Sequence, residues 1–212
     1  MKGNLKMEIS ACVFDFGGVM TPALNPDLVK PIAESQGLDW NKIVEGYKKH
    51  RRLMDGDFIS LREMYQRIFI DMNASVDKDA FEKILEADTE SFLFRNEETL
   101  SFMNKVRKMN FSIGILTNMS IPFSKRFREV FADYIALADA VVVSGEEKLF
   151  KPMREIYDLT AHRLGVQPGE ICFFDDIEEN CEAARAAGWS AIRFISAEDA
   201  ERKFLSKVDI CK

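Results

Sequence analysis

Short apolar runs recur along the 212-residue chain, and each of the first four leads directly into polar residues. The runs have the length of single strands, and patterns typical of helices lie between them. Near-continuous apolar strands that alternate with helices indicate a parallel sheet covered by helices on both faces. We therefore predict an α/β fold with a doubly wound parallel sheet. The expected strands are residues 11–14, 111–116, 140–143, 171–174 and 190–195.

The alternation of strands and helices stops between residues 20 and 95, where only helical patterns are found. Four consecutive helices inserted after the first strand would form a small bundle that can cover the strand ends. We therefore predict a core of residues 1–19 and 96–212 and an all-helical insert of residues 20–95. The expected helices of the insert are residues 27–36, 40–54, 61–72 and 77–92.

The charge and composition disfavour several classes of partner. The chain has 29 Lys and Arg against 35 Asp and Glu, and this net charge of −6 disfavours nucleic acids and anionic membranes as partners. No apolar run approaches the roughly 20 residues that span a bilayer, and Met1–Ser10 lacks the apolar segment of a secretory signal. The cysteines show no C-x-x-C spacing, so we expect buried thiols in a reducing, cytoplasmic setting. The oligomeric state is not predicted.

The polar residues that follow the strands supply what a phosphoryl-transfer site needs. In a doubly wound sheet the ligand site lies beyond the carboxyl ends of the strands, where this chain has Asp15, Thr117, Asp175 and Asp176. A carboxylate can attack phosphorus to form an aspartyl-phosphate, and Lys151 adds a positive charge for the phosphate oxygens. Three carboxylates at adjacent strand ends repel one another unless a cation lies among them. We therefore predict Mg²⁺ as the cofactor.

Each of these residues also has a purely structural interpretation. Asp15 is typical of the start of a tight turn, and Asp176 is typical of a helix cap. Lys151, before a proline at a helix start, is typical of a solvated side chain. Thr117 is typical of a turn in which the side chain hydrogen-bonds to the backbone. Taken separately, these interpretations do not explain why the residues gather at strand ends. We therefore favour the phosphoryl-transfer site.

Four short motifs in the sequence resemble those of the haloacid-dehalogenase-like hydrolases. They occur in that family's order and span nearly the whole predicted core, and only the helical insert is weakly matched. The resemblance implies a Rossmann-like core with a small helical cap at residues 20–95. The motifs are Phe14-Asp15-Phe16-Gly17-Gly18-Val19, Leu116-Thr117-Asn118, Lys151-Pro152 followed by Ile156-Tyr157, and Phe173-Phe174-Asp175-Asp176 followed by Asn180.

The resemblance also implies which residues hold the metal. By that resemblance, Asp15 is the nucleophile and a metal ligand, and the backbone carbonyl of Gly17 is a second ligand. Asp176 binds the metal directly, and Asp175 supports it or binds through water.

A second set of motif residues is implied to hold the substrate. By resemblance to the family, Thr117 and Lys151 bind the phosphate oxygens, and the backbone N–H groups of Gly18 and Asn118 assist them. Asn180 is implied to orient Lys151 or the acidic pair. The expected partner is therefore a small phosphorylated substrate.

Position 17 departs from the pattern of most phosphatases that this chain resembles. Those enzymes have a second Asp there, which protonates the leaving oxygen and then activates the hydrolytic water, whereas this chain has Gly17. The glycine form occurs in a branch that resembles sugar-phosphate phosphatases, and we expect position 17 to admit only glycine. We predict a Mg²⁺-dependent phosphatase for a small phosphorylated metabolite, such as a sugar phosphate, and leave open what replaces the acid.

Two alternative functions follow from the same residues. A 2-haloacid dehalogenase also uses an Asp nucleophile, but its relatives favour Tyr where Gly17 stands and need no metal, so the acidic pair disfavours it. Mutases of the same fold depend on the missing acid and rank lower. The second alternative is a catalytically weakened module that binds phosphate or a partner protein. Thr117 and Lys151 favour an enzyme over such a module.

Several other conspicuous residues have simpler interpretations. The basic run Lys48–Arg52 lies on an expected helix of the insert, and we favour a solvated face over contact with substrate. His162 is expected to be an exposed helix residue. Trp40 and Trp189 are expected to serve in packing.

Overall fold

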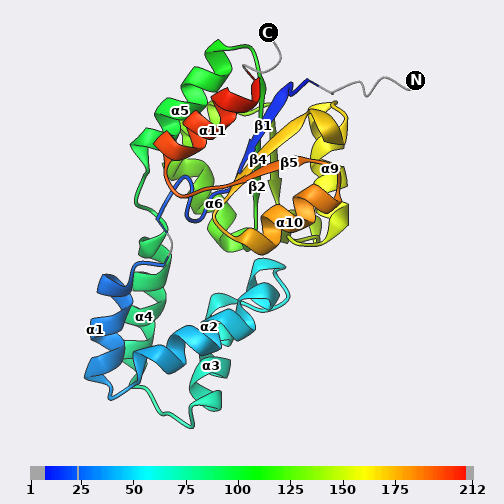
Figure 1. Ribbon diagram of the computed structural model, residues 1–212. Coiled ribbons are helices and arrows are strands. Elements are labelled where there is room, and N and C mark those ends of the chain that lie inside the picture. The colour runs from blue at the N-terminus through cyan, green and yellow to red at the C-terminus, as the bar shows by residue number, and fades with distance from the viewer. Residues whose placement is uncertain (1–7, 23, 209–212) are drawn as a thin grey trace.

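The computed structural model of the chain describes residues 8–22 and 24–208 and contains a five-stranded parallel sheet (Figure 1). The strands are β1 Ala11–Phe14, β2 Ser112–Thr117, β3 Ala140–Val143, β4 Ile171–Asp175 and β5 Ser190–Arg193. Their order in the sheet is β3-β2-β1-β4-β5, so β1 lies at the centre. Each strand lies where an apolar run predicts it, and the doubly wound α/β fold is confirmed.

Helices cover both faces of this sheet. The helices that alternate with the strands along the chain are α5 Glu97–Lys108, α6 Ile121–Val130, α7 Ala132–Leu137, α8 Ser144–Glu147, α9 Arg154–Leu164, α10 Glu178–Ala186 and α11 Ala197–Val208, with a short 3₁₀ helix at Pro168–Glu170. Phe14 of β1 packs in one apolar cluster with Phe102 of α5 and Phe204 of α11. Val13, the preceding residue, belongs to the cluster of Tyr157 from α9 on the opposite face, because successive strand residues point to opposite faces. Figure 1 shows α5 and α11 on one side of the sheet and α9 and α10 on the other.

Four further helices lie between β1 and α5 and share an apolar cluster of their own. They are α1 Pro26–Ser35, α2 Trp40–Asp55, α3 Leu61–Asp71 and α4 Lys78–Ser91. Each begins after a polar residue whose side chain accepts a hydrogen bond from the first turn, namely Asn25, Asp39, Ser60 and Asp77. The four helices expected in the insert are therefore observed. Its assignment as a separate unit of residues 20–95, apart from 1–19 and 96–212, stays a prediction.

The insert meets the core at the carboxyl ends of the strands, as Figure 1 shows. The backbone carbonyl of Asp55, at the end of α2, accepts a hydrogen bond from the Ser144 hydroxyl directly after β3. Arg52 of α2 donates to Glu179 of α10 at 2.6 and 2.5 Å. These contacts fix the last turn of α2 beside the edge of the sheet where a ligand site is expected.

Two predictions about the surroundings of the chain can be compared with this fold. Among residues 8–22 and 24–208, none of the helices combines the length and apolarity needed to cross a bilayer. Cys12, Cys172 and Cys181 are free, buried thiols, as predicted. Cys211 and most of the N-terminal segment Met1–Ser10 lie outside the described residues.

Candidate active site

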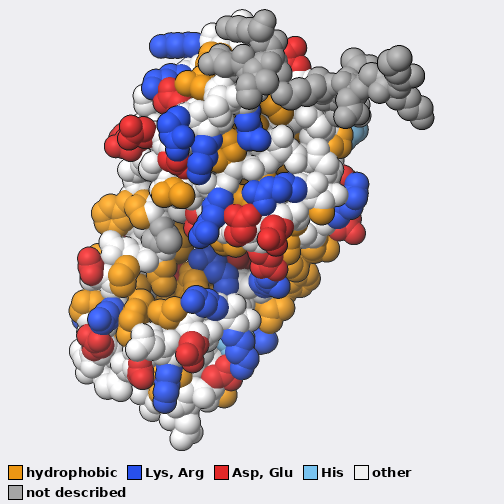
Figure 2. Space-filling view, viewed as in Figure 1, with side chains coloured by type: hydrophobic (Ala, Val, Ile, Leu, Met, Phe, Trp, Pro, Cys, Tyr) orange, Lys and Arg blue, Asp and Glu red, His pale blue; other side chains and the backbone are white. Residues whose placement is uncertain are grey.

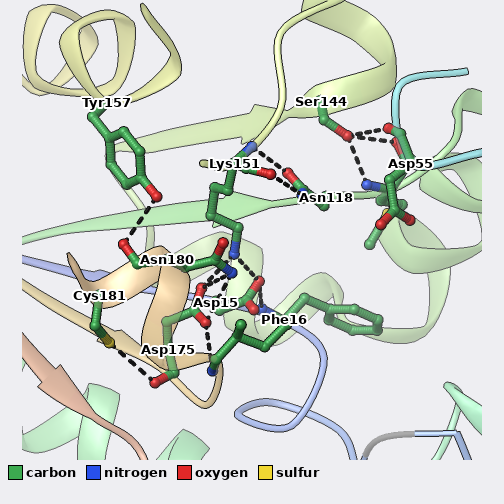
Figure 3. Close-up of polar contacts among 12 residues, drawn as sticks. Asp15, Phe16, Asp55, Asn118, Ser144, Lys151, Tyr157, Asp175, Asn180 and Cys181 are labelled. Carbon is green, nitrogen blue, oxygen red and sulfur yellow. Dashed lines mark hydrogen bonds and ion pairs between the residues drawn. The ribbon is translucent and has the colours of Figure 1, made fainter. Parts of the chain in front are cut away.

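Three carboxylates meet at the carboxyl ends of β1 and β4. Asp15 follows β1, Asp175 ends β4, and Asp176 is the next residue. One carboxylate oxygen from each residue lies within 4.8 Å of the others. The neighbouring parallel strands β1 and β4 end at the same edge of the sheet, so the backbone alone brings these side chains together. We call Asp15, Asp175 and Asp176 the acidic cluster (Figure 3).

Lys151 lies inside this cluster. Its Nζ is 2.7 Å from Oδ1 of Asp15 and 2.6 Å from Oδ2 of Asp175, and the residue is only 2% exposed. The interpretation of Lys151 as a solvated side chain is therefore wrong. One ammonium group among three carboxylates leaves an excess of negative charge in a buried place. A divalent cation with oxygen ligands fits this set of donors, since carboxylates are the ligands that Mg²⁺ prefers.

The electrostatics of the cluster agree with that excess of charge. Burial raises the pKa of Asp15 well above its ordinary value, and the charges of Asp175 and Asp176 raise it further, while Lys151 acts in the opposite direction. Burial and the charge of Asp175 likewise raise the pKa of Asp176. Burial opposes the charge on Lys151, but Asp15 and Asp175 together raise its pKa. The protein groups alone do not neutralise the acidic cluster, and a bound cation would.

Neighbouring polar groups hold Lys151 and Asp175 in place. Asn118 exchanges two hydrogen bonds with the backbone of Lys151, at 2.9 and 2.8 Å. Asn180 donates to both carboxylate oxygens of Asp175 at 3.0 Å, and the Ile177 N–H donates to the same carboxylate at 2.8 Å. Of the two partners expected for Asn180, the structure places it on the acidic pair. The alternative of Asp176 as a helix cap is wrong, because α10 begins after Ile177 without a side-chain cap.

The two adjacent glycines after β1 have different surroundings. Gly18 has a φ of +75°, and a Cβ added to it would lie 2.4 Å from Cγ of Asp176. Gly18 is therefore needed where it stands, because the carboxylate of Asp176 rests against it. A Cβ added to Gly17 would meet only Phe92, with its nearest ring carbon at 4.0 Å. The expectation that position 17 admits only glycine is wrong, since a Cβ fits there without a clash.

A cleft of about 1260 Å³ separates the acidic cluster from the insert. Figure 2 shows this hollow, with Lys and Arg side chains in and around it. Of the predicted site residues, Asp15, Gly17, Asn118, Lys151, Asp176 and Asn180 line the cleft. Thr117, Gly18 and Asp175 are not on its wall, and Thr117 is a buried residue at the end of β2. The facing side, which we call the insert wall, includes Trp40, Val44, Tyr47, Lys48, Arg51, Arg52, Arg62, Asp88, Thr89 and Phe92.

Arg51 is a cation of the insert wall that several side chains hold in place. Its Nε lies 3.2 Å from both carboxylate oxygens of Asp55, and its Nη1 donates to the Tyr47 hydroxyl at 2.9 Å. The guanidinium also lies over the rings of Tyr47 and Phe92, at 5.2 and 5.1 Å. The prediction of a solvated face is therefore wrong for Arg51, although Lys49 fits it. The spacing of Tyr47, Arg51 and Asp55 by four residues each was the signal that one helix face carries all three.

A buried carboxylate lies further along the same wall. Asp88 is 3% exposed and accepts a hydrogen bond from the Tyr65 hydroxyl at 2.8 Å. Burial raises the pKa of Asp88 to about 6, although the Tyr65 hydrogen bond and the charge of Arg51 act in the opposite direction. Trp40 packs against the apolar cluster of the insert, as predicted, and also lines the cleft. His162 is exposed and Trp189 is buried in the core, as predicted.

Comparison with known proteins gives one family. A family model described as haloacid dehalogenase-like hydrolase matches residues 9–188. A phosphatase of Mycobacterium tuberculosis is 27% identical over 188 residues, which cover 87% of each chain. An (S)-2-haloacid dehalogenase of Burkholderia cepacia is 23% identical over 194 residues, covering 88% of this chain and 83% of the relative. A solved haloacid dehalogenase family enzyme of Bacteroides thetaiotaomicron matches with a TM-score of 0.71 at 22% identity, over 93% of this chain and 99% of that chain.

Proposed function

This chain belongs to the haloacid dehalogenase-like hydrolase family, and from that premise we propose that it is a Mg²⁺-dependent phosphatase of small phosphorylated metabolites. The observation that supports this most is the acidic cluster with Lys151 buried in it, because these groups match the needs of phosphoryl transfer. In this proposal Asp15 is the nucleophile. The helices α1–α4 act as the cap of the enzyme.

We assign the metal to the acidic cluster and its backbone neighbour. Asp15 and Asp176 would hold Mg²⁺ with the carbonyl of Gly17, and Asp175 would support them from its bonds to Asn180 and Lys151. When bound, Mg²⁺ neutralises charge on the carboxylates and on the substrate phosphate. The Bacteroides thetaiotaomicron relative has also been solved in complex with magnesium and inorganic phosphate, which supports this assignment.

The residues of the site divide the work of the reaction. A carboxylate oxygen of Asp15 attacks phosphorus, the bond from phosphorus to the ester oxygen breaks, and that oxygen leaves with the electron pair. Water then attacks the aspartyl-phosphate at phosphorus, and Asp15 recovers its carboxylate. Lys151 and Thr117, with the N–H groups of Gly18 and Asn118, hold the phosphate oxygens. Lys151 is well suited to this role because two carboxylates fix its Nζ in advance.

A 2-haloacid dehalogenase is the second candidate, because a relative with that activity matches most of the chain. It would use Asp15 in the same way, with a carbon atom as the target. It gives no role to Asp175 and Asp176, which would leave two carboxylates beside the nucleophile, one of them fully buried, without a function. A cleft of about 1260 Å³ is also larger than a short haloacid needs. We therefore favour the phosphatase.

The insert wall supports a polar leaving group such as a sugar or polyol. The polar residues Tyr47, Asp88 and Thr89 line the wall that faces the acidic cluster. Such groups hydrogen-bond to hydroxyls, while Trp40 and Phe92 offer apolar faces to a ring. A sugar phosphate therefore suits the cleft, with its phosphate at Lys151 and its sugar against the insert wall.

The direct test is a screen for release of inorganic phosphate from sugar phosphates, polyol phosphates and nucleotides. We expect activity with Mg²⁺ and none with a chelator. The variant Asp15→Asn should fold normally, by circular dichroism, and lose activity, because its amide does not form an acyl-phosphate. Asp27→Asn, on the first turn of α1 away from the acidic cluster, is the matched control. Phosphate release by Asp15→Asn at the wild-type rate, or chloride release from 2-haloacids without phosphatase activity, would contradict the proposal.

A further inference from the structure

The phosphatase proposed above lacks an acid at position 17, and we propose that Asp55 of the insert supplies it. Asp55 would act as general acid for the leaving oxygen and then as general base for the hydrolytic water. This inference rests on the proposed phosphatase function and assigns a catalytic role to a residue outside the four motifs.

The end of α2 holds Asp55 at the strand ends. The Ser144 hydroxyl donates to the backbone carbonyl of Asp55 and accepts a hydrogen bond from the Met119 N–H at 2.8 Å. Met119 directly follows Asn118, which binds the backbone of Lys151 (Figure 3). Asp55 is 5% exposed and lines the same cleft as Asp15. Its backbone is therefore fixed to the core while its side chain belongs to the cleft.

Arg51 and Phe92 link Asp55 to the place where the missing acid would stand. The ring of Phe92 lies 4.0 Å from a Cβ built on Gly17, and the guanidinium of Arg51 lies 5.1 Å from the centre of the same ring. Arg51 in turn binds both oxygens of Asp55. The ion pair of Arg51 and Asp55 is thus separated from position 17 by one aromatic ring. The charge of Lys151 also reaches Asp55 and lowers its pKa, although burial outweighs it.

Burial and the charged groups around Asp55 act on its pKa in opposite directions. Arg51 is the cation that Asp55 shares with Asp88, and the two carboxylates are both buried. Burial raises the pKa of Asp55, with Arg51 and then Lys151 acting against it, and raises that of Asp88 to about 6. The Tyr65 hydroxyl on α3 donates to Asp88. A buried carboxylate whose pKa is raised keeps its proton to higher pH than an exposed one does, which suits the role of a general acid.

The proposed steps conserve atoms and protons. As Asp15 attacks phosphorus, the ester bond breaks, and the proton of the Asp55 carboxyl group passes to the leaving oxygen, which departs as an alcohol. Asp55 is then a carboxylate. It removes a proton from water as the water oxygen attacks the aspartyl-phosphate, whose bond to Asp15 breaks. Asp55 is protonated again, and the products are one alcohol and one inorganic phosphate.

Other carboxylates on the cleft wall are less suited to this role. Asp57 accepts from Lys148 at 3.0 Å and from the Ile121 N–H at 3.3 Å, so both of its oxygens join the insert to the core. Glu179 is exposed and binds Arg52. These contacts make Asp57 a matched control, because it lies in the same turn as Asp55 and contacts the core without facing Arg51.

The test compares an alkyl with an aryl phosphate in the full-length chain. The alkyl substrate is the best sugar phosphate of the screen, and the aryl substrate is p-nitrophenyl phosphate, whose leaving group departs readily without a proton. We expect Asp55→Asn to lower kcat by about 10²–10⁴-fold for the alkyl phosphate and by less than about 10-fold for the aryl phosphate. The decline of alkyl kcat at high pH, where the wild-type acid loses its proton, should disappear. Asp57→Asn should lower both rates alike or leave them unchanged.

A second variant tests the inference even if Asp55→Asn disturbs the insert. Gly17 has room for a side chain, so Gly17→Asp in the Asp55→Asn background should restore alkyl turnover by at least about 10-fold. Equal losses for both substrates with no rescue would overturn the role of Asp55, and so would an unchanged alkyl rate in Asp55→Asn. Either result can be obtained only if the wild-type chain is a phosphatase, whereas failure of the proposed function shows itself as no phosphate release by the wild type.

Discussion

The two walls of the cleft carry their charges in different ways. On the sheet side, the acidic cluster surrounds one buried ammonium, that of Lys151, and holds more negative than positive charge. On the insert wall, Arg51 is balanced by buried carboxylates, and Lys48 is an exposed cation at the edge of the cleft. The sheet side therefore favours a metal ion and a phosphate. The insert wall is nearly neutral at its centre and carries both polar and apolar side chains, which suits the organic part of a substrate.

This difference predicts separate effects of substitution on the two walls. Changes beside the acidic cluster should affect all phosphoesters alike, since each substrate places the same group there. Changes on the insert wall should affect substrates unequally or act on stability. The following three variants test this division.

The largest effect is expected from Lys151→Met. The substitution removes the cation fixed among Asp15 and Asp175 and with it one charge that stabilises the transferring phosphoryl group. We expect kcat/KM to fall by about 10²–10³-fold, as for the loss of one preorganised donor, and by the same factor for every phosphoester. Steady-state assays with several substrates measure this. Lys148→Met, which removes the partner of Asp57 at the surface, is the control; unequal losses across substrates in Lys151→Met would contradict the division of the two walls.

An intermediate effect, on stability, is expected from Asp88→Asn. The pKa of Asp88 is raised to about 6 in the folded protein, mainly by burial. Its contribution to the free energy of unfolding is therefore fully present below about pH 4, the ordinary range of an Asp, and is lost as the pH rises through about 6. The variant keeps an acceptor for Tyr65 and does not ionise, so it should lose this dependence and gain about 2–3 kcal/mol relative to wild type between these limits.

Thermal or urea unfolding from pH 4 to pH 8 measures this dependence. Asp71→Asn provides a control whose difference from wild type should stay flat over this interval, because Lys49 and His50 lower the pKa of Asp71 below its ordinary value. Its contribution is present above the ordinary Asp range and is lost as the pH falls. A difference between Asp88→Asn and wild type that does not vary with pH would show that Asp88 is charged throughout.

The smallest effect is expected from Lys48→Ala. Lys48 lines the cleft but is exposed, so its charge is screened by solvent. We expect changes in kcat/KM of only a few fold, since such exposed charges are worth about 1 kcal/mol or less, and we expect them to differ between substrates with and without a second anionic group. Lys49→Ala is the matched control, because Lys49 is the next residue and pairs with Asp71. Identical profiles for the two variants would mean that Lys48 does not meet the substrate.

The sheet side of the site could be predicted almost completely from the sequence. The predicted residues Asp15, Asp175 and Asp176 follow apolar runs of a parallel sheet, so their position at one edge could be predicted, whereas the pairing of β1 with β4 is seen only in the structure. The burial of Lys151 could not be predicted in the same way. Its burial depends on a loop between α8 and α9 that Asn118 fixes from another strand.

The insert wall could be predicted only as a set of helices. Which side of α2 faces the cleft depends on how the helix is rotated and docked, and Arg51 and Lys49 lie on different sides although they are two positions apart. A buried Asp88 is likewise invisible in the sequence, where it is one of many acidic residues of the insert. The error at Gly17 has a similar cause, since the space beside it is set by Phe92, which comes from the far end of the insert.

The space at position 17 has a consequence for how such enzymes diverge. Glycine and aspartate codons can differ by one base, and a Cβ at position 17 meets no clash. A proton donor can therefore be gained there while one on the insert is still present, and either can later be lost without an inactive ancestor. Gly18 allows no such step, because any side chain would displace Asp176. Two glycines that look alike in the sequence thus differ, because a Cβ fits at Gly17 and collides with Asp176 at Gly18.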